Sequence, residues 1–186
     1  MLVHLEENPT GGPTNPFIFL KVFRLISTSA FWSLVSDLVS VISHLQFYPS
    51  HSVSNHLKRA GSGRFAHSLR VGYISFLLSR LVGCSSSICA RAGVLHDAGY
   101  DVEDAANVLR QLLSHAEKGA RIAEYIGEPR RVVEAIRTHM FPLGGPPKTV
   151  ESFVVWLADK MDAVLELLGL TRLLDGAIKL PEARCK

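Results

Sequence analysis

The stretch GVLHDAGYD, residues 93–101, places His96 directly before Asp97 at the end of an apolar run. Adjacent helical residues point about 100° apart, so the two side chains do not face each other, yet both can reach one atom that lies between them. A metal ion is one such atom, because neutral imidazole is the commonest metal ligand. The alternative is a polar His at the edge of the core beside a surface Asp. The rest of the chain has to separate these two interpretations.

Length and composition indicate one domain of ordinary size. The chain has 186 residues, enough to bury a hydrophobic core without disulfides or a structural metal, so a bound metal would be functional. Its 20 Lys and Arg residues against 17 Asp and Glu give a net charge of +3 without a basic run, which argues against a nucleic-acid partner. The three cysteines form neither an even set nor a C-x-x-C pair. This usage fits a reducing compartment and predicts cytoplasmic localisation.

The N-terminal third divides into a tail and an apolar stretch. Residues 1–16 contain three prolines, two glycines and no periodicity, which predicts a mobile tail. Residues 17–63 are predicted to add helices that pack on the core. Within the apolar stretch at residues 16–47, the longest uncharged run, residues 25–36, has 12 residues, well short of the roughly 20 that a spanning helix needs. No transmembrane segment or signal peptide is expected, and peripheral membrane contact is the alternative to packing.

The remainder of the chain is predicted to be helical. Apolar residues recur at helical spacing, and no β-branched alternation bounded by hairpin turns occurs, so the fold class is all-α. Gly83, Gly127 and the Pro- and Gly-rich stretch at 141–149 indicate turns. We expect helices over residues 17–28, 31–46, 64–82, 86–98, 103–114, 116–126, 129–140 and 149–169.

Polar side chains fall on the apolar faces of these helices. The apolar companions at helical spacing are Val71, Ile74 and Leu78 for His67, and Val155, Trp156 and Ala163 for Asp159. A buried carboxylate is costly without a cation, a metal or several hydrogen bonds. Alone, His67 could be a hydrogen-bonded core residue, and Asp159 could pair with Lys160 or a distant Arg. Inward His and carboxylate groups on separate helices are, however, how helical bundles build metal sites.

Two further histidines extend this set. His115 is predicted to begin the helix over 116–126, and His139 to end the helix over 129–140, so both border loops where a cleft would open. Successive candidates from His67 to Asp159 lie 19 to 29 residues apart. Each gap accommodates one helix and its turn, so every ligand can arrive from a different helix.

The order His, His-Asp, His, His, Asp resembles the HD superfamily of metal-dependent phosphohydrolases over residues 64–168. The motifs that carry the resemblance are RFAHSLRVG, AGVLHDAGYD, SHAEKGARIAEYIG, AIRTHMFPLGGPP and ESFVVWLADKMD. AIRTH and LADKMD are similar to the bacterial HD proteins that split diadenosine tetraphosphate symmetrically. HMFPL with ESFVVWLADK resembles small bacterial HD phosphohydrolases more strongly. Many HD hydrolases carry a Lys shortly after the His-Asp pair, where this chain has Gly99, Tyr100 and Asp101.

The resemblance implies one or two divalent metal ions. The implied ligands are His67, His96, Asp97 and Asp159 for the first ion, and His115 and His139 for the second, with Asp97 bridging. Nitrogen and carboxylate ligands without thiolate suit Mn, Fe, Co, Ni or Zn better than Ca. A water held between two such ions would become a hydroxide able to attack phosphorus in line.

Charged residues near the ligands are candidates for contact with substrate phosphate. Arg64 lies one turn before His67 and Lys118 one turn after His115, so both are predicted catalytic and substrate-binding residues. Arg137, which flanks His139, is a third candidate for substrate binding. The alternative for each is a solvated surface charge.

The sequence thus predicts an HD-domain helical bundle with extra N-terminal helices. The HD domain is expected over residues 64–170, followed by a tail or helix over 171–186. The predicted function is hydrolysis of a phosphate ester or phosphoanhydride of a nucleotide or related small molecule. One alternative is a nucleotide-binding HD module with little or no turnover. The other is a membrane-surface protein steered by its N-terminal helices.

Overall fold

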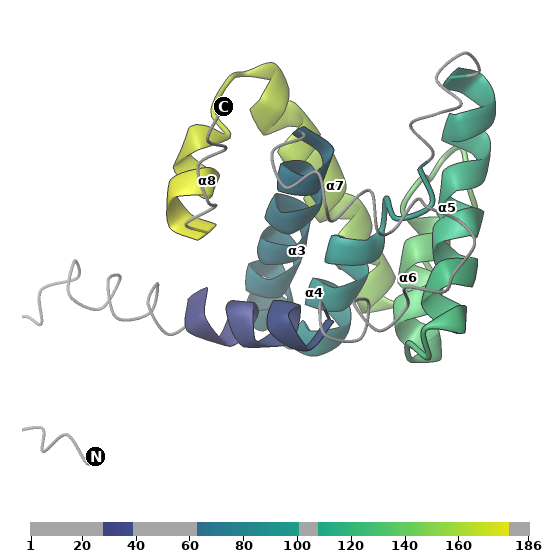
Figure 1. The fold of residues 1–186 in the computed structure, drawn as a ribbon, viewed down its shortest axis with the longest axis horizontal. Helices are drawn as coiled ribbons and strands as arrows, with labels where there is room; N and C mark the ends of the chain where they lie inside the picture. Colours follow the sequence, from purple (N-terminus) through teal and green to yellow (C-terminus); the bar gives the residue numbers. More distant parts are fainter. Residues whose placement is uncertain (1–27, 39–62, 101–107, 179–186) are drawn as a thin grey trace, which may run out of the picture.

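Every regular element in the described part of the chain is a helix (Figure 1), as the all-α prediction requires. The computed structural model describes residues 28–38, 63–100 and 108–178. The elements are a helix over residues 28–38, α3 (Gly63–Val82), α4 (Ser86–Leu95), α5 (Val108–Tyr125), α6 (Arg130–Thr138), α7 (Val150–Leu167) and α8 (Arg172–Ile178). The predicted N-terminal tail and most of the predicted N-terminal extension lie outside the described residues.

Local sequence explains where several helices begin and end. Ser85 and Thr149 are the N-caps of α4 and α7, and each side-chain oxygen accepts a hydrogen bond from a backbone N–H three residues later. Gly83 ends α3 with a φ of 74°, a conformation that a side chain would disfavour. Gly127, with a φ of 80°, separates α5 from α6. The turns predicted at the two glycines are confirmed.

The predicted end of the helix at residue 98 is wrong. α4 stops at Leu95, so His96 is its C-cap and Asp97 lies in the turn that follows. The backbone N–H of Ala98 bonds to the carbonyl of Leu95, three residues back, which is the tight pattern of a helix end. The chain therefore leaves the helical path at the His-Asp pair itself.

The predicted break between helices at residue 115 is also wrong. The described chain is one continuous helix from Val108 to Tyr125, so His115 lies inside α5 rather than at a helix end. The buried face continues across the predicted break, through Gln111, His115 and Gly119, and this tertiary packing keeps the helix intact.

α3 lies in the middle of the bundle, against α4 and α7, with α8 beside it, while α5 and α6 form a neighbouring pair (Figure 1). The helix over residues 28–38 packs on this core through the buried ring of Phe31, which contacts Tyr73. Trp32 Nε1 donates a hydrogen bond to the carbonyl of Ile178 on α8 over 2.9 Å. Among the described residues, no helix combines the length and apolarity that crossing a membrane requires. The domain boundaries stay a prediction.

Two glycines bring α3 and α4 unusually close together. A Cβ on Gly72 would lie 2.5 Å from the Val94 side chain, and a Cβ on Gly93 would lie 2.8 Å from the Cα of Gly72. α3 carries His67 and α4 ends at His96, so this close approach brings the two histidines within reach of one another. Their ring centroids are 5.1 Å apart.

Candidate metal centre

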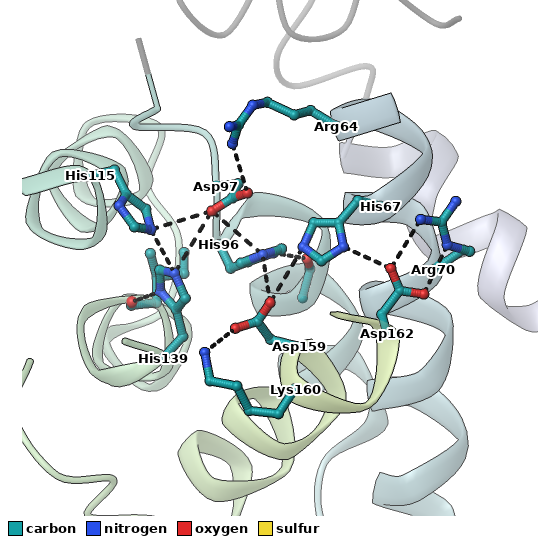
Figure 2. A network of polar contacts seen from close by, with 12 residues as sticks. Arg64, His67, Arg70, His96, Asp97, His115, His139, Asp159, Lys160 and Asp162 are labelled. Atoms are coloured by element: carbon teal, nitrogen blue, oxygen red, sulfur yellow. Dashed lines mark hydrogen bonds and ion pairs between the residues drawn. The ribbon is translucent and has the colours of Figure 1, made fainter. Parts of the chain in front are cut away.

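Four histidines and two aspartates from five helices or their ends meet in one place (Figure 2). They are His67 from α3, His96 and Asp97 from the end of α4, His115 from α5, His139 from the end of α6, and Asp159 from α7. These are the six residues that the sequence analysis selected as ligands. Their role as ligands stays a prediction, but their convergence is a feature of the fold.

Three of the histidines are oriented by backbone carbonyls near them in the chain. The Nδ1 atoms of His96, His115 and His139 lie 2.8, 2.8 and 2.7 Å from the carbonyl oxygens of Gly93, Gln111 and Ile136. A carbonyl oxygen only accepts, so Nδ1 carries the proton in each ring. When these imidazoles are neutral, every Nε2 presents a bare lone pair to the centre.

Those lone pairs need a positive partner. The Nε2 atoms of His115 and His139 are 3.0 Å apart. The Nε2 of His96 is buried and has no hydrogen-bond partner among the described residues. Facing lone pairs and an orphaned buried nitrogen are costly in a protein interior. A divalent transition metal would accept these lone pairs, so the donor set fits such an ion.

Asp97 lies at the middle of the cluster. Its Oδ1 is 3.4 Å from the Nε2 of His115, 3.6 Å from that of His96 and 3.8 Å from that of His139. Burial alone would raise the pKa of Asp97, but the surrounding imidazoles, His96 foremost, lower it below its ordinary value. Asp97 is therefore an anion with several nitrogen donors around it. A carboxylate so placed can bridge two ions.

Asp159 is a second carboxylate that faces histidine nitrogens of the cluster. Its Oδ1 lies 3.3 Å from the Nε2 of His67 and 3.7 Å from the Nε2 of His96, while its Oδ2 accepts a 2.7 Å bond from Lys160. The alternative that Lys160 pairs with Asp159 is thus seen, and it leaves Oδ1 facing the histidines. In each of three triplets, the possible ligand atoms lie within 4.8 Å of one another: His67, His96 and Asp159; His96, Asp97 and His139; and His67, Asp162 and Glu166.

Hydrogen-bonded carboxylates separate the protonation states of two histidines that are both largely buried. Burial, helped by the neighbouring His96, lowers the pKa of His139 to about 3, so its ring is neutral at pH 7. Burial also acts to lower the pKa of His67, but hydrogen bonds to Asp159 and Asp162 outweigh it and raise that pKa to about 10. The His67 position therefore favours positive charge.

The predicted phosphate-binding residues differ in their surroundings. Arg64 Nη1 lies 3.6 Å from Asp97 Oδ2, and the guanidinium carbon of Arg64 lies 3.3 Å from the ring centroid of Tyr100. Lys118 is exposed and makes no ion pair within the described ranges. Of these two residues, Arg64 is therefore the one held directly at the rim of the cluster.

Arg137 is engaged by acidic side chains. Its guanidinium nitrogens lie 2.9, 3.2 and 2.9 Å from the carboxylates of Glu117, Glu124 and Glu134, respectively. These partners hold the charge on the outer surface of α5 and α6. The predicted role of Arg137 in substrate binding stays a prediction, and it would require Arg137 to leave these partners.

Gly99 explains why no long side chain follows the His-Asp pair at this position. A Cβ on Gly99 would lie 2.3 Å from both the backbone nitrogen of Gly119 and the carbonyl oxygen of His115. The turn after Asp97 therefore packs directly on the α5 backbone. This contact holds Asp97 close to His115.

Two residues behind His67, Asp162 and Arg70, were not predicted from the sequence. His67 Nδ1 lies 2.7 Å from Asp162 Oδ2, and Asp162 in turn accepts hydrogen bonds of 2.8 and 3.0 Å from Arg70. The inward face of α7 was expected to include Ala163, which is exposed, whereas Asp162 is fully buried. The available signal was spacing, because Asp162 follows Asp159 by three residues and Arg70 follows His67 by three.

Known proteins are similar to this chain over the part that contains the cluster. The HD domain family matches residues 64–164. Ribonuclease Y of Deinococcus radiodurans is 30% identical over 131 residues, which cover 70% of this chain and 20% of that protein. Ribonuclease Y of Thermus thermophilus is 29% identical over 130 residues, with the same shares covered. The chain therefore spans about a fifth of the length of these curated relatives.

A solved structure shows the same fold. The HD domain of the L. monocytogenes phosphodiesterase PgpH aligns with a TM-score of 0.52 at 20% sequence identity. The alignment covers 70% of this chain and 84% of that chain. At this identity the likeness concerns the fold.

Proposed function

Because this chain belongs to the HD domain family, a family of metal-dependent phosphohydrolases, we propose that it hydrolyses a phosphate ester or phosphoanhydride of a nucleotide or related small molecule. The observation that carries the proposal is the convergence of the Nε2 atoms of His96, His115 and His139 on Asp97, while each Nδ1 faces a backbone carbonyl. A binding module with little turnover would not require so complete a set of donors.

The proposed ligands fall into two groups that share Asp97. The first ion would be held by His67, His96, Asp97 and Asp159, and the second by His115 and His139 with Asp97 between the two. A divalent transition metal bound there supplies a Lewis acid and an activated water for attack on phosphorus. Mn, Fe, Co, Ni and Zn all suit this donor set.

The remaining groups would bind and orient the substrate. Arg64 can contact a phosphate oxygen from the rim, because Tyr100 holds its guanidinium beside Asp97 while leaving the side chain partly exposed. Lys118, exposed on α5, would add a second cation on the His115 side. Both charges offset the negative charge of the phosphate group.

The substrate class is supported by what the similar proteins are called. The curated relatives are named ribonucleases and the structural neighbour is named a phosphodiesterase. Both names describe cleavage of phosphorus–oxygen bonds, and the name ribonuclease specifies RNA as the molecule that is cleaved. A small nucleotide fits the absence of a basic run in the sequence, and a short RNA is the second candidate because of the relatives' name.

The test combines metal analysis with a substrate panel. Protein purified without chelator is expected to contain at least one equivalent of transition metal and to hydrolyse a member of a panel of nucleotides, dinucleoside polyphosphates, phosphodiesters and short RNAs. Asp97→Ala should lose both metal and hydrolysis. Glu128→Gln, which alters a buried carboxylate outside the cluster, is the matched control and should keep both. Full metal content in Asp97→Ala would contradict the central role of this residue.

A further inference from the structure

His67 is oriented differently from the other histidines of the cluster. His96 and His139 are C-caps, where the last carbonyls of a helix are free to accept a hydrogen bond, and each ring uses such a carbonyl. His67 lies near the N-terminal end of α3, and its Nδ1 lies 2.7 Å from a carboxylate oxygen of Asp162 on α7. Among the cluster histidines described, only this one takes its Nδ1 partner from another helix (Figure 2).

Asp162 is itself held in a fixed place. Arg70, which is 3% exposed, donates to both of its oxygens, over 2.8 Å from Nε and 3.0 Å from Nη2. Arg70 also contacts Glu166 on α7 and, over 3.2 Å, Asp175 on α8. Such a two-point contact between a guanidinium and a carboxylate fixes the plane of the carboxylate. Asp162 therefore presents Oδ2 to His67 in one orientation.

This arrangement matters because the His67 ring is otherwise free to turn. The terminal torsion of a histidine is broad, so its ring needs an outside contact to select one orientation. The bond to Asp162 turns Nε2 toward Asp159, which lies 3.3 Å away. A carboxylate is also a stronger acceptor than a carbonyl, so it makes the ring a better donor through Nε2.

We propose that Asp162 is a positioning residue of the metal centre: it holds the His67 ring with Nε2 toward Asp159 and strengthens His67 as a ligand. The inference rests on the function proposed above, because it requires an ion at the centre. In this proposal Asp162 is not itself a ligand, because its two oxygens are already engaged by Arg70 and His67. It acts through His67, and Arg70 in turn keeps Asp162 in place.

The experiment titrates metal-free protein with Co²⁺ and follows binding by calorimetry and by visible absorption. Asp162→Asn keeps the size of the side chain and removes its charge. It is expected to weaken the binding of one ion by about 10- to 100-fold, as is usual for a carboxylate behind a metal-ligating histidine. The Co²⁺ absorption bands should shift, because they report the ligands around the ion.

Glu128→Gln is the matched control. Glu128 is a buried carboxylate that also accepts two hydrogen bonds from one arginine, Arg91. Glu128 lies before the start of α6, and His139 lies directly after its end. α6 has 9 residues, so about 14 Å of helix separates Glu128 from the cluster residue His139. This variant should lose stability as Asp162→Asn does, while Co²⁺ affinity and absorption stay as in the wild type.

A second variant covers the case in which Asp162→Asn does not fold. Asp162→Asn could prevent folding because it leaves the buried charge of Arg70 without its main partner. The double variant Arg70→Met/Asp162→Asn removes both charges and is expected to show the same loss of Co²⁺ affinity. Wild-type affinity and absorption in a folded Asp162 variant would overturn the proposal, and so would an equal loss of affinity in Glu128→Gln. If the wild type takes up no Co²⁺ at all, the metal centre and the proposed function fail together with it.

Discussion

The two halves of the cluster are built in different ways. On the α5 and α6 side, His115 and His139 are oriented by carbonyls of their own helices. On the α3 and α7 side, His67 is oriented by Asp162, a residue of the opposite helix. The rings of the first half are oriented as soon as their helices form, although α5 and α6 must pack together to bring them face to face. The His67 ring is oriented only when α3 and α7 are packed together. Local structure thus fixes the ring orientation in one half and tertiary structure fixes it in the other.

Charge also differs between the halves. The α3 and α7 half contains Asp159 and Asp162, whereas the α5 and α6 half has two imidazoles, one of which burial keeps neutral. Anionic oxygens attract a cation more strongly than neutral nitrogens do. We therefore expect the α3 and α7 half to bind its ion more tightly. Asp97, between the halves, should contribute to both.

The largest expected effect comes from removing the α5 and α6 half. The double variant His115→Ala/His139→Ala should stay folded, keep about one metal ion, and lose hydrolysis by several orders of magnitude, because the nucleophile would be generated between the ions. Metal stoichiometry beside wild-type protein is the measurement. Unchanged stoichiometry with a raised KM would mean that these histidines contact phosphate and do not bind metal.

Gly99→Ala tests the contact between the turn that follows Asp97 and the backbone of α5, in the α5 and α6 half of the cluster. The added Cβ would lie 2.3 Å from backbone atoms of α5, which cannot yield as a flexible side chain does. We expect a loss of about 1–3 kcal/mol in the free energy of unfolding, together with weaker binding of the second ion. Urea denaturation and metal titration measure the two effects. Gly145→Ala, where nothing lies within 4 Å, is the control and should change neither.

Arg64→Ala should lower activity without disturbing either half. Loss of a charged hydrogen bond to substrate phosphate is expected to reduce kcat/KM by about tenfold or somewhat more. Metal content should not change, because Arg64 supplies no ligand atom. Steady-state kinetics on the substrate found in the panel provides the measurement, with Arg121→Ala, an exposed arginine of α5, as the comparison. Equal losses in both variants would indicate a general charge effect.

The smallest effect is expected at Asp175 on α8, which contacts Arg70 but not Asp162 or His67. Asp175→Asn removes one partly exposed contact of Arg70 and leaves both bonds from Arg70 to Asp162. Such exposed pairs contribute about 0–1 kcal/mol, so thermal stability should fall slightly. Co²⁺ affinity should stay within about twofold of the wild type, because the Asp162 carboxylate is still held. A larger loss of affinity would show that α8 determines the position of Asp162.

Sequence patterns predicted most of the helices and all six clustered residues. Apolar spacing placed α3 and α7 close to their observed limits, and the order of His and Asp residues selected side chains that meet in the fold. These features depend on periodicity and on one ligand per helix, both of which can be read along the chain. The predicted helix end at residue 98 and the predicted break at residue 115 were wrong because contacts with another helix, at Gly99 and along α5, decided them.

Only the tertiary structure decided which charged groups support the cluster and which are diverted from it. Asp162 and Arg70 come together because α3 lies against α7, and Arg137 faces three glutamates because α5 lies against α6. In the sequence, each of these residues is a charge on a helix, and helical periodicity says only which face it occupies. Its partner depends on the neighbouring helix and on the register of packing. Burial makes the partner of each charge important for stability. A charge removed from water is costly unless a neighbouring helix supplies a group of opposite charge or a hydrogen bond.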